Sequence, residues 1–329
     1  MQNLKDKIDV GHIQRNDAVL ANAAILYYKE GLTQNEIAKR MGVSRATVVN
    51  YLRLARENNI VDIRINGASF STSKLSKDLK RKFGLNDAYV ADHTSGGADS
   101  GENHIANLNR HVARVGAAAL FDILNPNDVM GVAWGETIHF LSEEISRGQI
   151  EGLTVCQMIG SMKTPLLSAA ETCAIRIASR LGAECNTLHT PAVLSSAELA
   201  SALRAEPTIK SQLEKFTEFT RTVFSVGNCD INTHVVRSSI TSEEEFNWYK
   251  SRGAVGVLCG RFIDEYGQHI AGAMDERMIG ISLDELRLLN CGVLVAGGPE
   301  KLLAIKAALA GGYVSHLVVD ESTAKKLLS

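Results

Sequence analysis

The 329-residue sequence lacks the signals of several common protein classes. Nowhere does it contain a run approaching the ~18 consecutive apolar residues that a membrane-spanning helix needs. Its first ten residues, MQNLKDKIDV, are charged and do not hold the apolar stretch of a secretory signal. We therefore expect a cytoplasmic protein that has no membrane partner.

Paired metal ligands and reactive motifs are missing as well. The six cysteines are scattered without a CxxC pair, and the nine histidines form no HxxxH or HExxH pattern. Cysteines spaced like this in a cytosolic chain are expected to be reduced core residues. No metal site is predicted. No Walker, Ser–His–Asp or paired-cysteine pattern points to a cofactor or to another chemistry.

A strong excess of one charge is absent too, because 35 Lys and Arg face 37 Asp and Glu. The charge is nevertheless uneven: residues 1–65 hold ten Lys and Arg against seven Asp and Glu, and residues 66–329 hold 25 against 30. This asymmetry alone does not establish nucleic-acid binding, but it makes the N-terminal segment the better candidate for contacting phosphates. The length predicts two domains, and the 45% hydrophobic content is that of a globular protein.

The N-terminal segment predicts three helices. Apolar residues recur at helical spacing between Asn16 and Lys29. Thr33 is a suitable N-cap for a second helix, and Glu36 completes a capping box three residues later. Gly42 then makes a tight turn, and Ser44 caps a third helix that runs to about residue 58.

Two helices joined by a glycine turn are the skeleton of a helix-turn-helix, whose second helix lies in the major groove of DNA. Val48, Leu52 and Ala55 face the core at helical spacing, which leaves a polar face outside. Arg can bond guanine, Asn can bond adenine, and residues at the start of the preceding helix can hold phosphate. A plain helical hairpin with a solvated face is the alternative, and Arg56 is either a phosphate contact or solvated. The predicted DNA-binding residues are Thr33, Gln34, Ser44, Arg45, Thr47, Asn50, Tyr51 and Arg53.

The end of this segment predicts a domain boundary. Residues 60–65 alternate apolar and polar, as in a short strand or wing. Residues 66–73, NGASFSTS, are small and polar and are interpreted as a linker. We therefore expect a winged helix-turn-helix domain over residues 1–65 and an effector-binding and oligomerisation domain over residues 66–329.

Beyond the linker, strands alternate with helices. A helix over 75–83 precedes a strand over 87–91, and a long helix ends near residue 124. This alternation predicts a doubly wound α/β domain, with a parallel sheet covered on both faces. The further strand-like runs are DVMGVAW, LTVCQMIG, AECNTLHTP, RTVFSVGN, AVGVLCGRFID, CGVLVAGG and VSHLVVD.

Three of these runs end in small residues followed by a helix, at 131–137 (GVAWGET), 160–164 (GSMKT) and 297–301 (GGPEK). Ligands of doubly wound sheets sit outside the carboxyl ends of the strands, at helix N-termini. Backbone N–H groups there suit hydroxyls or phosphate oxygens, and Lys301 adds a positive charge. For each loop alone, a purely structural glycine turn is the alternative.

Taken together, these segments resemble the SorC family of bacterial sugar-responsive transcriptional regulators over nearly the full length. The matching segments are LTQNEIAKRMGVSRATVVNYLRLARENNIV at 32–61, GVAWGETI at 131–138, RGAVGVLCGRFIDEYG at 252–267 and the long run at 277–328. The resemblance implies a large domain similar in fold to ribose-phosphate and glucosamine-phosphate isomerases. It also implies double-stranded operator DNA and a sugar, polyol or sugar-phosphate effector as partners, and a dimer or tetramer. In sugar-phosphate-responsive relatives, the position of Lys301 contacts the effector.

Two positions depart from the family pattern. Val257 stands where related regulators often have an aspartate that can bond sugar hydroxyls, and Ser161 replaces the second glycine of a Gly-Gly turn. These departures favour a changed effector, such as an unphosphorylated sugar or polyol. Val257 and Trp134 either pack against the carbon face of a sugar or belong to the core. The predicted effector-binding residues are Trp134, Gly135, Glu136, Thr137, Gly160, Ser161, Met162, His189, Val257, Arg261, Gly297, Gly298 and Lys301.

An enzyme is the rival interpretation. Isomerisation of a sugar phosphate needs a positioned carboxylate base, and ribose-phosphate isomerases carry an Asp-Gly-Ala-Asp-Glu loop for it. The nearest string, GGADS at 96–100, lacks the neighbouring acids and is interpreted as a surface loop. We therefore predict a regulator of a carbohydrate or polyol catabolic operon and no enzyme. An isomerase with a DNA-binding appendage is the alternative, and a DNA-binding protein without a ligand would leave the large domain unexplained.

Overall fold

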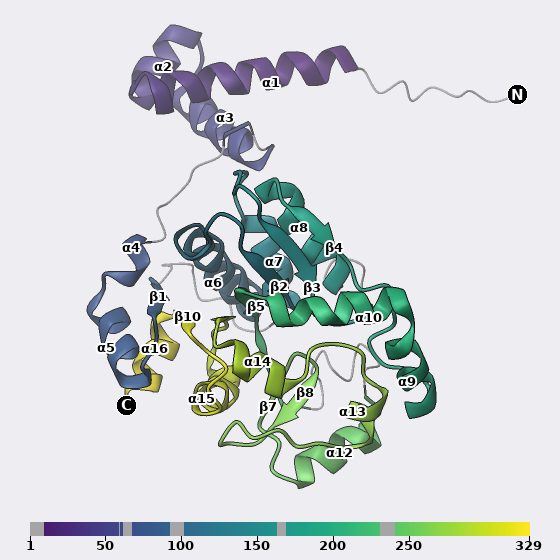
Figure 1. Ribbon diagram of the computed structural model, residues 1–329. Helices are drawn as coiled ribbons and strands as arrows, with labels where there is room; N and C mark the ends of the chain where they lie inside the picture. Colours follow the sequence, from purple (N-terminus) through teal and green to yellow (C-terminus); the bar gives the residue numbers. More distant parts are fainter. Residues whose placement is uncertain (1–9, 59, 62–67, 93–101, 163–168, 231–240) are drawn as a thin grey trace, which may run out of the picture. The chain divides into compact units, whose positions relative to one another are not determined.

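The computed structural model describes residues 10–58, 60–61, 68–92, 102–162, 169–230 and 241–329 (Figure 1). The chain divides into two compact units, Met1–Arg64 and Ile65–Ser329. Among the described residues, none of the helices combines the length and apolarity that crossing a bilayer requires.

The N-terminal unit is helical. Its described elements are α1 (Val10–Ala24), the π-helix η1 (Ile25–Lys29) that continues it, α2 (Gln34–Met41) and α3 (Arg45–Glu57). The predicted capping box is confirmed, because the Glu36 amide donates to Thr33 Oγ1 at 3.4 Å and the Thr33 amide donates to Glu36 Oε2 at 2.8 Å. Gly42 ends α2 with φ of 67°, a left-handed conformation that glycine adopts without strain. Val48, Leu52 and Ala55 are buried, as the helical spacing predicted.

The region after α3 differs in part from the prediction. The strand expected over 60–65 lies largely outside the described residues, and the described pair, Ile60 and Val61, is not in a strand. Both of their amides donate to the Ala55 carbonyl. Residues 66 and 67 of the expected linker also lie outside the described part, but the four residues that follow them form helix α4 (Ala68–Ser71). Phe70 of α4 packs half-buried against the core of the α/β unit, so this segment belongs to that unit.

The α/β unit is built on a seven-stranded parallel sheet in the order β1-β10-β9-β5-β2-β3-β4. From β2 the chain moves outward to β3 and β4, and from β5 it moves the other way to β9 and β10. The sheet is therefore doubly wound, as predicted, with its switch point between β2 and β5. Its strands are β1 (Asp87–Ala91), β2 (Val129–Val132), β3 (Thr154–Gln157), β4 (Glu184–Asn186), β5 (Arg221–Phe224), β9 (Gly292–Val295) and β10 (His316–Asp320).

Helices cover both faces of this sheet, since alternate strand residues enter two separate cores. In β9, Val293 and Val295 face one core and Leu294 faces the other. On the first face lie α6 (Glu102–Ile123), α7 (Glu136–Glu144) and α8 (Ala170–Leu181). The second core includes residues of α5 (Lys74–Phe83), α9 (Ala197–Ala205), α10 (Pro207–Glu214), η3 (Lys215–Glu218), α14 (Leu283–Leu289), α15 (Leu302–Ala310) and α16 (Glu321–Leu328).

A second, three-stranded antiparallel sheet was not predicted. The run AVGVLCGRFID was expected to be one strand of the main sheet, but it forms a hairpin that pairs with a third strand. Cys259 and Gly260 make its two-residue turn with φ of 49° and 79°, the left-handed conformations that a tight hairpin requires. The strands are β6 (Val226–Asn228), β7 (Gly256–Leu258) and β8 (Arg261–Ile263), and α12 (Glu243–Ser251) and α13 (Ala273–Arg277) pack against them.

Candidate functional site

The exposed face of α3 carries the first candidate site. Arg45, Asn50 and Arg53 are all exposed on it. Arg45 Nε donates to Gln34 Oε1 at 3.2 Å, which joins the recognition helix to the start of α2. Arg53 donates to Asn50 Oδ1 at 2.8 Å. These four side chains therefore form a polar surface whose members can exchange their mutual hydrogen bonds for contacts with base edges and phosphates.

The other predicted DNA-binding residues have structural partners. Thr33 is engaged in the capping box of α2. Ser44 Oγ accepts from the Thr47 amide at 3.0 Å, and the two hydroxyls of this pair lie 2.8 Å apart. Tyr51 packs half-buried against the cluster of Leu20, Ala24 and Ala55. Thr33 thus caps α2, Ser44 and Thr47 form the amino end of α3, and Tyr51 helps to pack α3 against its neighbours.

The sequence reading missed Val49, whose side chain is 45% exposed on α3. An exposed apolar side chain on a recognition helix suits the methyl group of thymine. The signal was present in the sequence: Val48 faces the core, and the next residue of a helix points about 100° away from it.

The second candidate site lies at the carboxyl ends of the parallel strands. One part of it is a cluster around Lys301, which follows β9 in the short helix η4 (Pro299–Lys301). Lys301 Nζ donates to Asn109 Oδ1 at 3.2 Å and to Thr137 Oγ1 at 3.1 Å. Asn109 Nδ2 in turn donates to Glu136 Oε2 at 3.2 Å. The structure thus brings three predicted residues together through Asn109, a buried residue of α6 that the sequence did not point to.

The ammonium of Lys301 is enclosed at this position. Burial lowers the pKa of Lys301, and the neighbouring carboxylates Glu300 and Glu136 oppose that shift. Gly135 lies at the head of α7 with φ of 118°, a conformation that favours glycine. The cluster therefore offers a partly desolvated donor beside the amino end of a helix.

The backbone around the two glycines after β9 has different contacts from those predicted. Their N–H groups were expected to face a ligand, but the Gly298 amide donates to Asp320 Oδ2 at 2.9 Å and to Thr323 Oγ1 at 3.0 Å. A Cβ atom at Gly297 would lie 2.6 Å from Asp320 Oδ2. Gly297 therefore allows the chain to pass close to the buried carboxylate of Asp320, and the Gly298 amide is already bonded.

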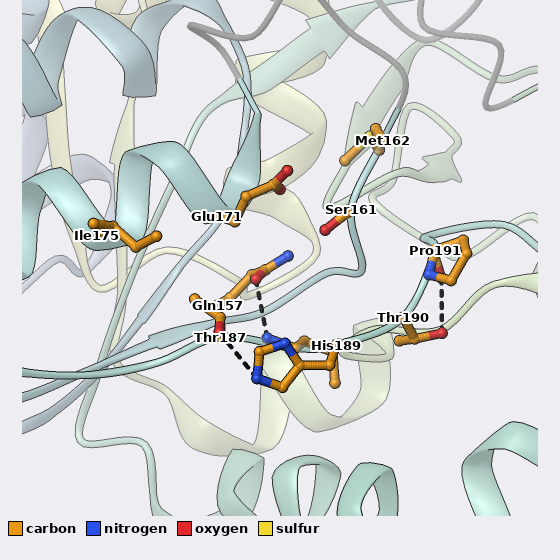
Figure 2. A pocket seen from close by; sticks show the side chains of 10 residues that line it. Gln157, Ser161, Met162, Glu171, Ile175, Thr187, His189, Thr190 and Pro191 are labelled. Atoms are coloured by element: carbon orange, nitrogen blue, oxygen red, sulfur yellow. Dashed lines mark hydrogen bonds between the residues drawn. The ribbon is translucent and has the colours of Figure 1, made fainter.

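A pocket of about 530 Å³ forms the other part of this site (Figure 2). It lies where β3 and β4 end and α8 begins, and its volume is in the range of small-molecule sites. Three predicted residues line it: Ser161, Met162 and His189. The further lining residues, which the sequence reading missed, are Gln157, Glu171, Ile175, Thr187, Leu188, Thr190 and Pro191.

Most polar groups around the pocket are bonded to the protein. Gln157 Nε2 donates to the Ile159 carbonyl at 2.6 Å, and Gln157 Oε1 accepts from the Leu188 amide at 3.0 Å. The His189 ring lies 3.4 Å from Thr187 Oγ1. These bonds hold Gln157 between the backbone that follows β3 and the backbone that follows β4, as a preorganised ligand site requires.

Four predicted residues lie at or beside the small sheet, and one of them, Met162, also lines the pocket. Val257 is 4% exposed within the core of the small sheet, so the structure places it in the core. Trp134 and Met162 pack half-buried against that core, which connects it to the pocket wall. Arg261 is buried, with a 2.8 Å ion pair to Asp275 and a 3.0 Å hydrogen bond to the Ile281 carbonyl. The guanidinium of Arg261 is therefore bonded to residues that surround the small sheet.

Gly160 brings two chain segments into contact beside the pocket, and Gly160→Ala is expected to destabilise the α/β unit by about 1–3 kcal/mol. A Cβ atom there would lie 2.5 Å from the Pro191 carbonyl oxygen, which is closer than a side chain can approach backbone. The matched control is Gly227→Ala, where the nearest atom is a Val257 carbon at 3.7 Å. Urea denaturation followed by tryptophan fluorescence measures both. Equal stability of the two variants would contradict this packing argument.

A helix-turn-helix joined to an α/β unit with polar strand ends defines the class of ligand-responsive DNA-binding proteins. Comparison with known proteins supports that class. Residues 68–329 match the family model described as "Putative sugar-binding domain", and residues 21–74 match the ParB HTH domain model. The chain is 39% identical over 316 residues to the "Uncharacterized transcriptional regulator YjhU" of Escherichia coli (strain K12), covering 95% of each chain.

Two further relatives agree with this match. The deoxyribonucleoside regulator of Bacillus subtilis (strain 168) is 29% identical, over 93% of this chain and 96% of that protein. The crystal structure of the full-length sorbitol operon regulator SorC from Klebsiella pneumoniae superposes with a TM-score of 0.70 at 26% identity, covering 96% of this chain and all of that one. The chain belongs to the SorC family of sugar-responsive transcriptional regulators.

Proposed function

We propose that the α/β unit binds a sugar, polyol or sugar-phosphate effector at its strand ends and that this binding controls the hold of α3 on operator DNA. The observation that carries the proposal is the pocket of about 530 Å³ at the carboxyl ends of the parallel strands, in a chain whose other unit exposes Arg45 and Asn50 on a recognition helix. Two relatives, a sorbitol operon regulator and a deoxyribonucleoside regulator, support control of a carbohydrate operon. The regulator acts in the cytoplasm and is not an enzyme.

The control is a linkage between two binding equilibria. A dimer or tetramer places recognition helices on operator half-sites, and the effector favours an arrangement with a different half-site spacing. The change in operator affinity is limited by the difference in effector affinity between the two arrangements. Selecting duplexes from a random library with the full-length protein, then titrating the best duplex with candidate effectors, tests both steps. Recovery of no preferred sequence would contradict the DNA-binding half of the proposal.

Lys301→Ala is expected to weaken effector binding by about tenfold or more, because a charge-assisted hydrogen bond contributes about 1.5–3 kcal/mol. Operator affinity without effector is expected to stay unchanged, since Lys301 belongs to the α/β unit. Titrating the effector into a complex of protein and labelled operator measures both quantities. The matched control is Lys306→Ala, an exposed lysine of α15. An unaltered response of the Lys301 variant would remove this residue from the site.

A further inference from the structure

The pocket holds one carboxylate whose bonding is incomplete. Glu171 lines the pocket from the first turn of α8, and its Oε2 atom is buried without a hydrogen-bond partner. In Figure 2 its carboxylate extends from α8 toward the segment that carries Ser161 and Met162. A buried oxygen without a partner is unusual in folded proteins, and a ligand is one way of satisfying it.

The chemistry of this oxygen restricts what the ligand can be. An ionised carboxylate only accepts hydrogen bonds, so a ligand at Glu171 has to present an O–H or N–H donor. Ser161 also lines this side of the pocket; its backbone is bonded to Thr190 and Ala192, and its hydroxyl can donate to a ligand or accept from it. No lysine or arginine lines the described part of the pocket, and Lys301 of the neighbouring cluster already donates to Asn109 and Thr137.

The helix end does not compensate for this lack. The amino end of α8, a helix of 12 residues, would by itself attract an anion. Glu171 already places a negative charge in its first turn. A phosphate in the pocket would therefore meet a like charge in a partly enclosed site, where such repulsion is stronger than in water.

From these observations we propose that the pocket selects an unphosphorylated polyhydroxy ligand, a neutral sugar or polyol, and that Glu171 determines this specificity by accepting a ligand hydroxyl. This inference rests on the proposed effector function and narrows it to one chemical class. An amino sugar also presents hydrogen-bond donors to Glu171, but it carries a positive charge. The experiment below distinguishes a neutral ligand from an amino sugar.

Thermal shift and calorimetry on the full-length protein test this proposal. The probes are sorbitol, xylitol, fructose and glucose, each paired with its terminal phosphate ester, together with glucosamine and inorganic phosphate. At least one neutral probe is expected to bind, at least tenfold more tightly than its own phosphate ester. If glucosamine bound more tightly than every neutral probe, the donor to Glu171 would be an ammonium and not a hydroxyl. That result would overturn the choice of a neutral ligand.

Glu171→Gln keeps the shape of the side chain and removes its charge. We expect it to weaken the neutral probe by about fivefold or more and to reduce the preference over the phosphate ester. The matched control, Glu198→Gln, changes an exposed glutamate in the first turn of α9 and is expected to leave both affinities unchanged. Melting temperature without ligand reports whether each variant is folded.

Three results would overturn the inference: tighter binding of a phosphate ester than of its parent, an unchanged preference in folded Glu171→Gln, or binding of none of the probes. The proposed function is judged separately by operator binding in the same preparation. A protein that binds duplex DNA but no neutral probe would keep the DNA-binding function and lose the ligand assignment. Loss of sequence-specific DNA binding would count against the proposed function itself.

Discussion

Asp275→Asn is expected to destabilise the α/β unit by about 3–5 kcal/mol, the usual cost of removing one partner of a buried ion pair. Asp275 Oδ1 accepts from Arg261 and His269, each at 2.8 Å. Its Oδ2 accepts from Tyr249 at 3.0 Å and from the Gly272 amide at 2.8 Å. An asparagine has one oxygen that accepts hydrogen bonds and an NH2 group that does not. The four residues that donate to the two carboxylate oxygens of Asp275 would therefore lose a charged acceptor, and some of their hydrogen bonds would be broken.

Urea denaturation measures this loss. Both tryptophans of the chain, Trp134 and Trp248, belong to the unit Ile65–Ser329, so their fluorescence reports the unfolding of that unit alone. The matched control is Asp284→Asn, an exposed aspartate in the first turn of α14, which is expected to change stability by less than about 0.5 kcal/mol. Similar stabilities of the two variants would show that the Asp275 network does not hold the small sheet.

The same carboxylate predicts a pH dependence. Burial alone would raise the pKa of Asp275, but hydrogen bonds from His269 and Gly272 and the charges of His269 and Arg261 outweigh it and lower the pKa to about 2. The folded pKa lies below the unfolded value of about 3.9, so the ionised carboxylate stabilises the fold above pH ~4. That contribution is lost as the pH falls from about 4 toward about 2. The stability gap between wild type and Asp275→Asn is expected to narrow over this interval.

Replacing Arg45 and Asn50 together by alanine is expected to reduce specific operator affinity by about 2–6 kcal/mol, since each base-reading side chain contributes ~1–3 kcal/mol. Both side chains are exposed in the free protein and lie on the face of α3 opposite its core. The loss therefore falls on DNA binding, and the melting temperature is expected to change little.

Fluorescence anisotropy at one fixed salt concentration, with the selected duplex and a scrambled duplex, measures this effect. The matched control is Arg40→Ala, which removes an exposed arginine of α2 that pairs with Glu30 at 3.1 Å. It removes the same charge and reports the nonspecific part of the loss. If the double variant kept its affinity and its preference for the selected duplex, the reading face would have to be assigned elsewhere.

The helix-turn-helix was predictable almost to the residue because its determinants are local. Thr33 with Glu36, Gly42 and Ser44 set the ends of two helices through bonds that span three or four residues. The main sheet was predictable because apolar strands alternate with helices along the sequence, and strands this apolar are buried on both faces. The hairpin of the small sheet was not predicted, because its reversal lies inside an apolar run that looks like one strand. A glycine in that run, Gly260, was the signal that could have indicated the turn.

The candidate site was predictable in its location and less so in its members. Three residues that were predicted from strand ends line the pocket, namely Ser161, Met162 and His189, and their contact with an effector stays a prediction. Glu171 was missed because its importance depends on where the amino end of α8 meets β3 and β4. Asn109 was missed for a similar reason: it sits in the middle of a long helix, and its partner Lys301 is brought to it by the fold.

The register of the sheet also governs the order in which the protein can mature during synthesis. Strand β1 pairs in the sheet with β10, Asp87 opposite His316, so this edge of β1 stays unpaired until residues 316–320 have left the ribosome. The N-terminal unit makes its contacts locally and can fold much earlier. A nascent chain can therefore fold its helix-turn-helix before its α/β unit. Premature termination before β10 would release a protein with a folded helix-turn-helix and an incomplete parallel sheet, whose exposed strand edge invites aggregation.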